Sequence, residues 1–129
     1  MSDALKQAAL KLFSEHGYEG TSLAQISEAV GLKKQSIYAH FKGKDDLFLK
    51  VVEEVFALEQ QHLASLLKEQ QDSPLQQCLF QTLRSYVDRF HESSQLRFYL
   101  RTSFYPPAHL YHEVIAHVNA LIDRIDAMF

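Results

Sequence analysis

Glycine and proline are scarce in this chain, which has four glycines and three prolines among its 129 residues. Both residues interrupt helices, glycine because its backbone is conformationally free and proline because it has no N–H to donate. No segment alternates apolar and polar residues as a half-buried strand does. The sequence therefore predicts an all-α fold, and its 47% of hydrophobic residues are enough to form a sizeable core.

Other absences exclude whole classes of protein. Cys78 is the single cysteine, so no internal disulfide can form, which agrees with a reducing cytoplasm. No apolar run reaches the roughly 20 residues that span a membrane, and no charged and apolar leader opens the chain. A glycine-rich phosphate loop, a nucleophile elbow and an HExxH motif are also lacking. We therefore expect no enzyme, no cofactor and no membrane partner, and we expect a cytoplasmic location.

Three histidines lie close together near the end of the sequence, at His109, His112 and His117. The first two are three residues apart and can share a helical face, whereas His117 points elsewhere on a regular helix. No cysteine or carboxylate lies at a useful spacing to complete a ligand set. We expect no metal site here.

The segment 21–44 contains two short helical patterns separated by a glycine. Leu23, Ile26 and Val30 recur at three- and four-residue spacing, which marks one face of a helix. Gly31 follows at the point where a left-handed residue commonly ends a helix. A second short helix after such a turn is typical of a helix-turn-helix, whose second helix enters the DNA major groove.

The start of the first of these helices has two candidate N-caps. Ser22 and Gln25 have the spacing of a capping box, and Thr21 is a competing cap. The sequence does not decide between them.

The distribution of charge along the chain supports a DNA-binding surface. The chain has a formal net charge of -3, yet residues 33–44 contain four lysines and no acid. A cationic patch on an anionic protein is what phosphate binding requires. The alternative is a solvated surface that happens to be rich in lysine.

Several motifs in the first third of the chain match one family. They are residues 9–18 (ALKLFSEHGY), 20–22 (GTS), 37–41 (IYAHF) and 44–47 (KDDL). Together they closely resemble the N-terminal domain of TetR-type transcriptional regulators. The resemblance implies a three-helix DNA-binding domain over residues 1–47 and a helical regulatory domain over residues 48–129.

The resemblance also implies roles for individual residues. A recognition helix from about residue 33 to residue 40 would bring Lys34, Gln35 and Ser36 nearest the base edges, where all three side chains can bond bases. The expected phosphate contacts are Thr21, Tyr38, His40 and Lys44. For Tyr38 the alternative is a ring that packs on the third helix, and for His40 an exposed surface histidine without a contact.

Lys33 departs from the family pattern, which often has serine or threonine at this position to cap the recognition helix. Lysine cannot accept the backbone hydrogen bond that such a cap requires, and its charge opposes the helix dipole. We interpret Lys33 as a further phosphate contact.

Helical patterns continue beyond the motif region. We expect helices over residues 2–16, 44–70, 74–91 and 95–104, and from residue 108 onward, with Ser73 as an N-cap and Pro74 at a first helical position. In the helix over 74–91, the apolar stripe expected to face inward comprises Leu75, Leu79, Phe80, Leu83, Val87 and Phe90.

Aromatic residues and arginines are interleaved in the second half of the chain. Apolar cavities between helices with a few polar groups are common small-molecule sites. A candidate effector pocket is therefore lined by Phe90, Phe98, Tyr99, Arg101 and Tyr105. Aromatic side chains at helical spacing are more often plain core, and the arginines of this region can instead form ion pairs with Asp88 or Glu92.

The last helix reaches Phe129 without a cap or a polar tail. Because TetR-type regulators usually continue further and dimerise through their last helices, we expect an incomplete regulatory domain.

The function that follows is a DNA-binding transcriptional regulator. The resemblance implies a repressor that binds a pseudo-palindromic operator as a homodimer and is released by a small-molecule effector. The alternative is a helical protein-interaction or ligand-binding module without DNA binding.

Overall fold

The computed structural model describes residues 2–128 and is helical in all its regular segments, which confirms the all-α prediction. The elements are α1 (Ser2–His16), α2 (Leu23–Ala29), α3 (Lys34–Ile37), α4 (Lys44–Glu69), α5 (Leu75–Phe90), α6 (Ser94–Phe104), the 3-10 turn η1 (Ala108–Leu110) and α7 (Tyr111–Met128). Among these helices, none combines the length and apolar character needed to cross a bilayer.

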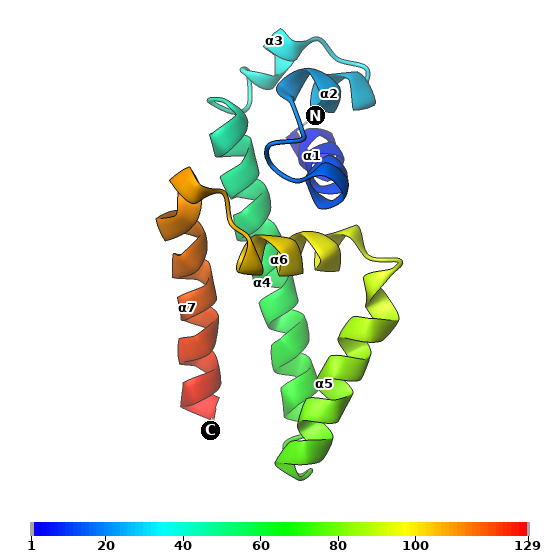
Figure 1. The fold of residues 1–129 in the computed structure, drawn as a ribbon, viewed down its shortest axis with the longest axis vertical. Coiled ribbons are helices and arrows are strands. Elements are labelled where there is room, and N and C mark those ends of the chain that lie inside the picture. The colour runs from blue at the N-terminus through cyan, green and yellow to red at the C-terminus, as the bar shows by residue number, and fades with distance from the viewer. Residues whose placement is uncertain (1, 129) are drawn as a thin grey trace.

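The 26-residue helix α4 runs along the long axis of the molecule (Figure 1). Helices α1, α2 and α3 gather at its N-terminal end, whereas α5 and α7 lie on either side of its C-terminal part. Helix α6 crosses α4 near the middle and also packs against α1. The first helices are therefore connected to the rest of the molecule through both α4 and α6.

The main hydrophobic core joins the first helices to the N-terminal half of α4 and to α6. Its buried members come from α1, α2, α3, α4, α6, η1 and α7, and from Phe41 in the connection before α4. At its centre the ring of Phe13 lies edge-on to Phe48 at 5.1 Å between centroids, and Phe98 of α6 lies 5.6 Å from Phe48. Phe98 is only 1% exposed. Burial of such rings supplies the largest hydrophobic contributions in a small domain.

The helix-turn-helix begins at Ser22, which resolves the choice of N-cap. The Ser22 hydroxyl accepts the Gln25 N–H at 3.1 Å, and the Gln25 side chain accepts the Ser22 N–H at 2.8 Å. This reciprocal pair is the expected capping box. After α2, Gly31 takes a φ of +72°, the left-handed conformation predicted for the turn.

The recognition helix is shorter than predicted. Its regular part covers Lys34–Ile37, and residues 38–40 continue it as a turn with bonds such as His40 N–H to the Ile37 carbonyl. Lys33 is the N-cap residue and provides no side-chain cap, as its chemistry requires.

Helix α5 contradicts the prediction for its apolar stripe. The six residues expected to face inward are between 43% and 70% exposed: Leu75, Leu79, Phe80, Leu83, Val87 and Phe90. The helix instead packs against its neighbours through smaller or polar side chains, of which Cys78 is buried. Periodicity identifies an apolar face of a helix, but it does not identify the neighbour that covers the face.

The start of α5 also differs from the prediction. Pro74 is the N-cap residue rather than the first helical residue, and no side chain caps this helix.

A buried carboxylate joins three helices in the middle of the molecule. Glu59 of α4 is 2% exposed, and its Oε1 accepts hydrogen bonds from Arg89 Nη2 of α5 at 2.6 Å and from Gln95 Nε2 of α6 at 2.9 Å. Arg89 Nη1 donates to Oε2 at 3.1 Å, so the pair is bidentate. Arg89 thus pairs with Glu59 rather than with either carboxylate considered from sequence. Buried charges persist only when they are paired in this way.

Gly31→Val tests the left-handed turn. Nothing lies within 4 Å of a Cβ added at this position, so the expected source of destabilisation is the backbone conformation rather than a clash of the Cβ. A β-branched residue resists positive φ, and we expect the free energy of unfolding to fall by about 1–2 kcal/mol or more in urea titrations. Gly31→Asn is the matched control and is expected to lose less, because asparagine tolerates this conformation. Equal free energies of unfolding for wild type and both variants would contradict the left-handed conformation assigned to Gly31.

Arg89→Ala tests the buried ion pair. Removing the cation leaves the Glu59 carboxylate buried without its charge partner. The side chain of Arg89 is 26% exposed, so we expect a loss of about 3 kcal/mol, at the low end for a buried pair. The double variant Glu59→Met/Arg89→Leu is expected to recover most of this stability, because an apolar pair has no desolvation penalty. A loss below about 1 kcal/mol for Arg89→Ala would show that the pair contributes little.

Candidate nucleic-acid interface

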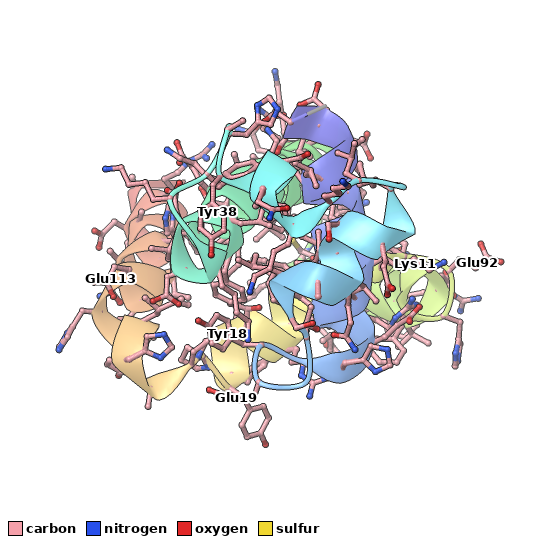
Figure 2. The ribbon with its side chains drawn as sticks, turned by 90° about the horizontal axis from the view of Figure 1, so that it is seen from above. Lys11, Tyr18, Glu19, Tyr38, Glu92 and Glu113 are labelled. Atoms are coloured by element: carbon pink, nitrogen blue, oxygen red, sulfur yellow. The ribbon has the colours of Figure 1, made fainter. Side chains whose placement is uncertain are left out.

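The end of the molecule that carries α2 and α3 presents most of the predicted DNA contacts to solvent. Lys33, Lys34, Gln35, Tyr38 and His40 are all exposed. Figure 2, which looks onto this end, shows Tyr38 on its outer face. Ser36, on the same helix, is half-buried and therefore less accessible than its neighbours Lys34 and Gln35.

The segment folds this way because its apolar side chains are buried in the core beneath α2 and α3. Ile26 and Ile37 are fully buried, and Phe41 is buried beside them in the core. With these side chains turned inward, the polar residues of α3 are left on the outside. The exposed set contains lysines, an amide, a phenol and an imidazole, and no carboxylate lies among residues 33–44.

The N-terminus of α4 borders this surface. Lys44 is half-buried, and its Nζ lies 3.9 Å from the centroid of the Tyr18 ring, in a cation–π contact. The backbone N–H of Lys42 is bonded to Asp46 Oδ2 at 2.9 Å, which orders the loop before the helix. A shallow hollow is lined by Tyr18, Lys42, Gly43, Lys44, Asp45 and Asp46. Unpaired N–H groups and the positive end of the dipole make such helix starts suitable for phosphate.

Thr21 requires a correction. It was expected to contact phosphate, but it is only 2% exposed, and its hydroxyl donates inward to the carbonyls of Gly17 at 2.9 Å and Leu12 at 3.2 Å. Its side chain therefore fastens the α1–α2 turn to α1 and is not presented to DNA. The neighbouring Ser22 is the exposed hydroxyl residue at the start of α2.

Sequence reasoning assigned no role to Tyr18, Asp45 or His109, which meet at the edge of this surface. Asp45 Oδ1 accepts a hydrogen bond from the Tyr18 hydroxyl and lies 2.9 Å from His109 Nε2. The hydrogen bond from Tyr18, and then that from His109, hold the pKa of Asp45 below its ordinary value. Burial and the Asp45 carboxylate raise the pKa of Tyr18, so its phenol stays protonated and donates. Asp45 and His109 are 64 residues apart, so no sequence spacing could have revealed this cluster.

The five residues predicted to line an effector pocket are not brought together. Phe98 and Tyr99 are core residues, and Tyr99 packs edge-on against Phe56 at 4.8 Å. Burial is the main cause that raises the pKa of Tyr99 to about 12. Phe90 is exposed on the outer face of α5, and Tyr105 is 82% exposed.

Arg101 also lies outside any such pocket. Its guanidinium covers the α1–α2 turn, where a Cβ added at Gly17 would lie only 2.7 Å from Nη2. A hollow of about 770 Å³ opens elsewhere, between the end of α4 and the start of α5. None of its lining residues was predicted to line a pocket. They are Ala64, Leu67, Lys68, Gln70, Gln71, Ser73, Leu75 and Cys78.

The three neighbouring histidines have separate surroundings. His109 bonds Asp45, His112 is exposed at the start of α7, and His117 packs against Phe56 at 5.8 Å. Among the side chains that the structure describes, no group of three potential ligands lies close enough to hold a metal ion.

Comparison with known proteins identifies the family. Residues 5–51 match the model of the bacterial regulatory proteins of the tetR family. Over 121 residues the chain is 32% identical to the negative transcriptional regulator IcaR of the biofilm operon icaADBC in Staphylococcus epidermidis. The chain belongs to the TetR family.

Another TetR-type relative is the transcriptional repressor BdcR of Escherichia coli, 31% identical over 86 residues, which are 67% of this chain and 43% of BdcR. A solved TetR-family transcriptional regulator from Agrobacterium tumefaciens is 26% identical, with a TM-score of 0.78 over 98% of this chain and 68% of that one. The match to IcaR covers 94% of this chain but only 63% of IcaR. The chain therefore spans less than two thirds of these curated relatives.

Lys33→Ser separates a capping defect from a DNA contact. Serine at the N-cap can accept a backbone N–H that Lys33 leaves without a side-chain partner, so we expect the free energy of unfolding to rise by about 0.5–1 kcal/mol. The same change removes a charge from the exposed surface, so affinity for duplex DNA is expected to fall. Lys33→Gln is the control, because it removes the charge without adding an N-cap. Unchanged DNA affinity in both variants would remove Lys33 from the predicted contacts.

Proposed function

We propose that this protein is a DNA-binding transcriptional repressor that uses α3 to read the major groove. The observation that carries the proposal is the acid-free segment of residues 33–44, whose lysines and polar side chains lie on α3, which follows the Gly31 turn, and on the segments that flank α3. The named activities of IcaR and BdcR, a negative transcriptional regulator and a transcriptional repressor, support the same function.

The proposed contacts are of two kinds: contacts to base edges, which read the DNA sequence, and contacts to phosphates, which position the protein. Lys34, Gln35 and Ser36 face the base edges, where glutamine can pair with adenine and lysine with guanine. Lys33, Tyr38, His40 and Lys44 contact the phosphates on both sides of α3. Phosphate contacts set the register of the protein, and base contacts select the sequence.

The complete regulator would act as a homodimer on a pseudo-palindromic site. Two recognition helices must then lie about 34–36 Å apart, one turn of the double helix. In the cytoplasm, a small molecule that prefers one spacing of these helices over the other would weaken DNA binding by the same coupling. The proposal divides the chain into a DNA-binding part over residues 1–47 and a regulatory part over residues 48–129.

Lys44→Ala tests the positioning contact. Loss of one phosphate contact should weaken binding about equally on all duplexes and lower the slope of log K against log salt by about 0.9. Fluorescence anisotropy at several salt concentrations measures both quantities. Lys68→Ala is the matched control, since it removes a lysine about 36 Å further along α4. A change in sequence preference without a change in slope would contradict the positioning role.

Gln35→Ala tests the reading contact. An amide that pairs with one base should be worth about 1–3 kcal/mol of discrimination at that position and nothing in the salt slope. Competition between duplexes varied one base pair at a time measures this preference. If selectivity is unchanged at every position, Gln35 does not read a base.

A further inference from the structure

The polar cluster of Tyr18, Asp45 and His109 joins three segments that are distant in sequence. Tyr18 belongs to the α1–α2 turn, Asp45 to the first turn of α4, and His109 to η1, the connection between α6 and α7. The ring of His109 also lies edge-on to the Tyr18 ring at 5.1 Å between centroids. These contacts link the connector before α7 directly to the end of α4 that borders the DNA-facing surface.

Strengthening of the fold does not explain this cluster. The side chains of His109 and Asp45 are 48% and 49% exposed, and half-exposed ion pairs contribute little to stability. The position of the cluster is more informative, because Asp45 directly follows Lys44, a proposed phosphate contact. A bare carboxylate at this place would repel the phosphate that Lys44 attracts.

The donors on Asp45 reduce this repulsion. The Tyr18 hydroxyl and His109 Nε2 both approach Oδ1, and Lys44 lies over the Tyr18 ring, so one carboxylate holds all three groups in place. A neutral imidazole donates one hydrogen bond, whereas a protonated imidazole also cancels the charge of Asp45.

We propose that His109 is a positioning residue for the DNA-contacting start of α4, and that its protonation against Asp45 tightens DNA binding at mildly acidic pH. This inference rests on the proposed function. It assigns to the connector between α6 and α7 a direct influence on the phosphate site of Lys44.

The charged and titratable groups around His109 set the sign of the effect. From α4 these are Asp45 and Lys44, and from the α1–α2 turn they are Tyr18 and, beside it, Glu19 (Figure 2). On the other side, His112 and Glu113 follow in the first turn of α7.

Asp45 stays ionised at neutral and mildly acidic pH, because its hydrogen bonds lower its pKa, and Tyr18 stays neutral. Protonation of His109 therefore adds one positive charge beside the phosphate site. Affinity for DNA is expected to increase as the pH falls and to decrease as it rises.

The test compares wild type, His109→Gln and His109→Ala on one duplex by fluorescence anisotropy, at pH 6 and pH 8 and constant salt. Glutamine can donate to Asp45 but cannot become charged. At pH 8 we expect His109→Gln to match wild type and His109→Ala to bind more weakly. At pH 6 we expect wild type to bind about threefold more tightly than His109→Gln, the effect of one charge several ångströms from a phosphate through water.

Two controls make the comparison specific. Wild type and His109→Gln share the other six of the seven histidines, so any contribution of those six to DNA affinity cancels in the ratio of the two affinities. His112→Gln, at an exposed histidine three residues further on, is expected to keep the wild-type pH profile. Circular dichroism at both pH values verifies that each variant is folded.

The outcomes separate the two proposals. Folded wild-type protein that shows no salt-dependent binding at either pH overturns the proposed function. Salt-dependent binding with coincident pH profiles for wild type and His109→Gln overturns the inference about His109 alone. A His109→Ala variant that binds as tightly as wild type at pH 8 also overturns it.

Discussion

The contact of Phe13 with Phe48 and Phe98 is the constraint on which the arrangement of this protein depends. These rings belong to α1, α4 and α6, so one buried cluster fixes the helix that braces the helix-turn-helix against the two helices that lead away from it. Close-packed interiors do not deform continuously. We therefore expect a shift of α6 or α4 to be transmitted to α1, and to α2 and α3, because their buried residues belong to the same core.

The buried ion pair of Glu59 and Arg89 gives the other end of α4 a different kind of constraint. Two guanidinium nitrogens of Arg89 bond the two carboxylate oxygens of Glu59, and this bidentate geometry requires one relative position of α4 and α5. Gln95 adds the start of α6 to the same carboxylate. In this arrangement the apolar stripe of α5 is exposed.

Features that depend on neighbours in sequence could be predicted, and features that depend on distant segments could not. The capping box of Ser22 and Gln25 and the left-handed Gly31 involve residues three or four positions apart, so the sequence pattern contains the whole interaction. The pairing of Arg89 in α5 with Glu59 in α4 joins residues thirty positions apart, which no local pattern contains.

In the candidate site, too, local features could be predicted from the sequence and features that depend on distant segments could not. The exposed lysines and polar residues of α3 follow from a local pattern, and their DNA contacts remain predictions. Thr21 and Ser22 are adjacent hydroxyl residues that only the packing of the α1–α2 turn distinguishes. Phe98 and Tyr99 could not be assigned to core or pocket, because aromatic residues at helical spacing are compatible with both.

The start of α4 has two electrostatic requirements that conflict. Acidic residues in the first turn stabilise a helix, and α4 has Asp45 and Asp46 there. A phosphate at the same place requires that these charges be compensated. Asp46 is bonded to a backbone N–H of the preceding loop, and Asp45 to Tyr18 and His109, so both carboxylates are occupied by donors from the protein. A donor from the connector before α7 thus takes part in compensating charge beside the proposed phosphate site. We therefore expect a movement of that connector to change the electrostatics of this surface without any displacement of α3.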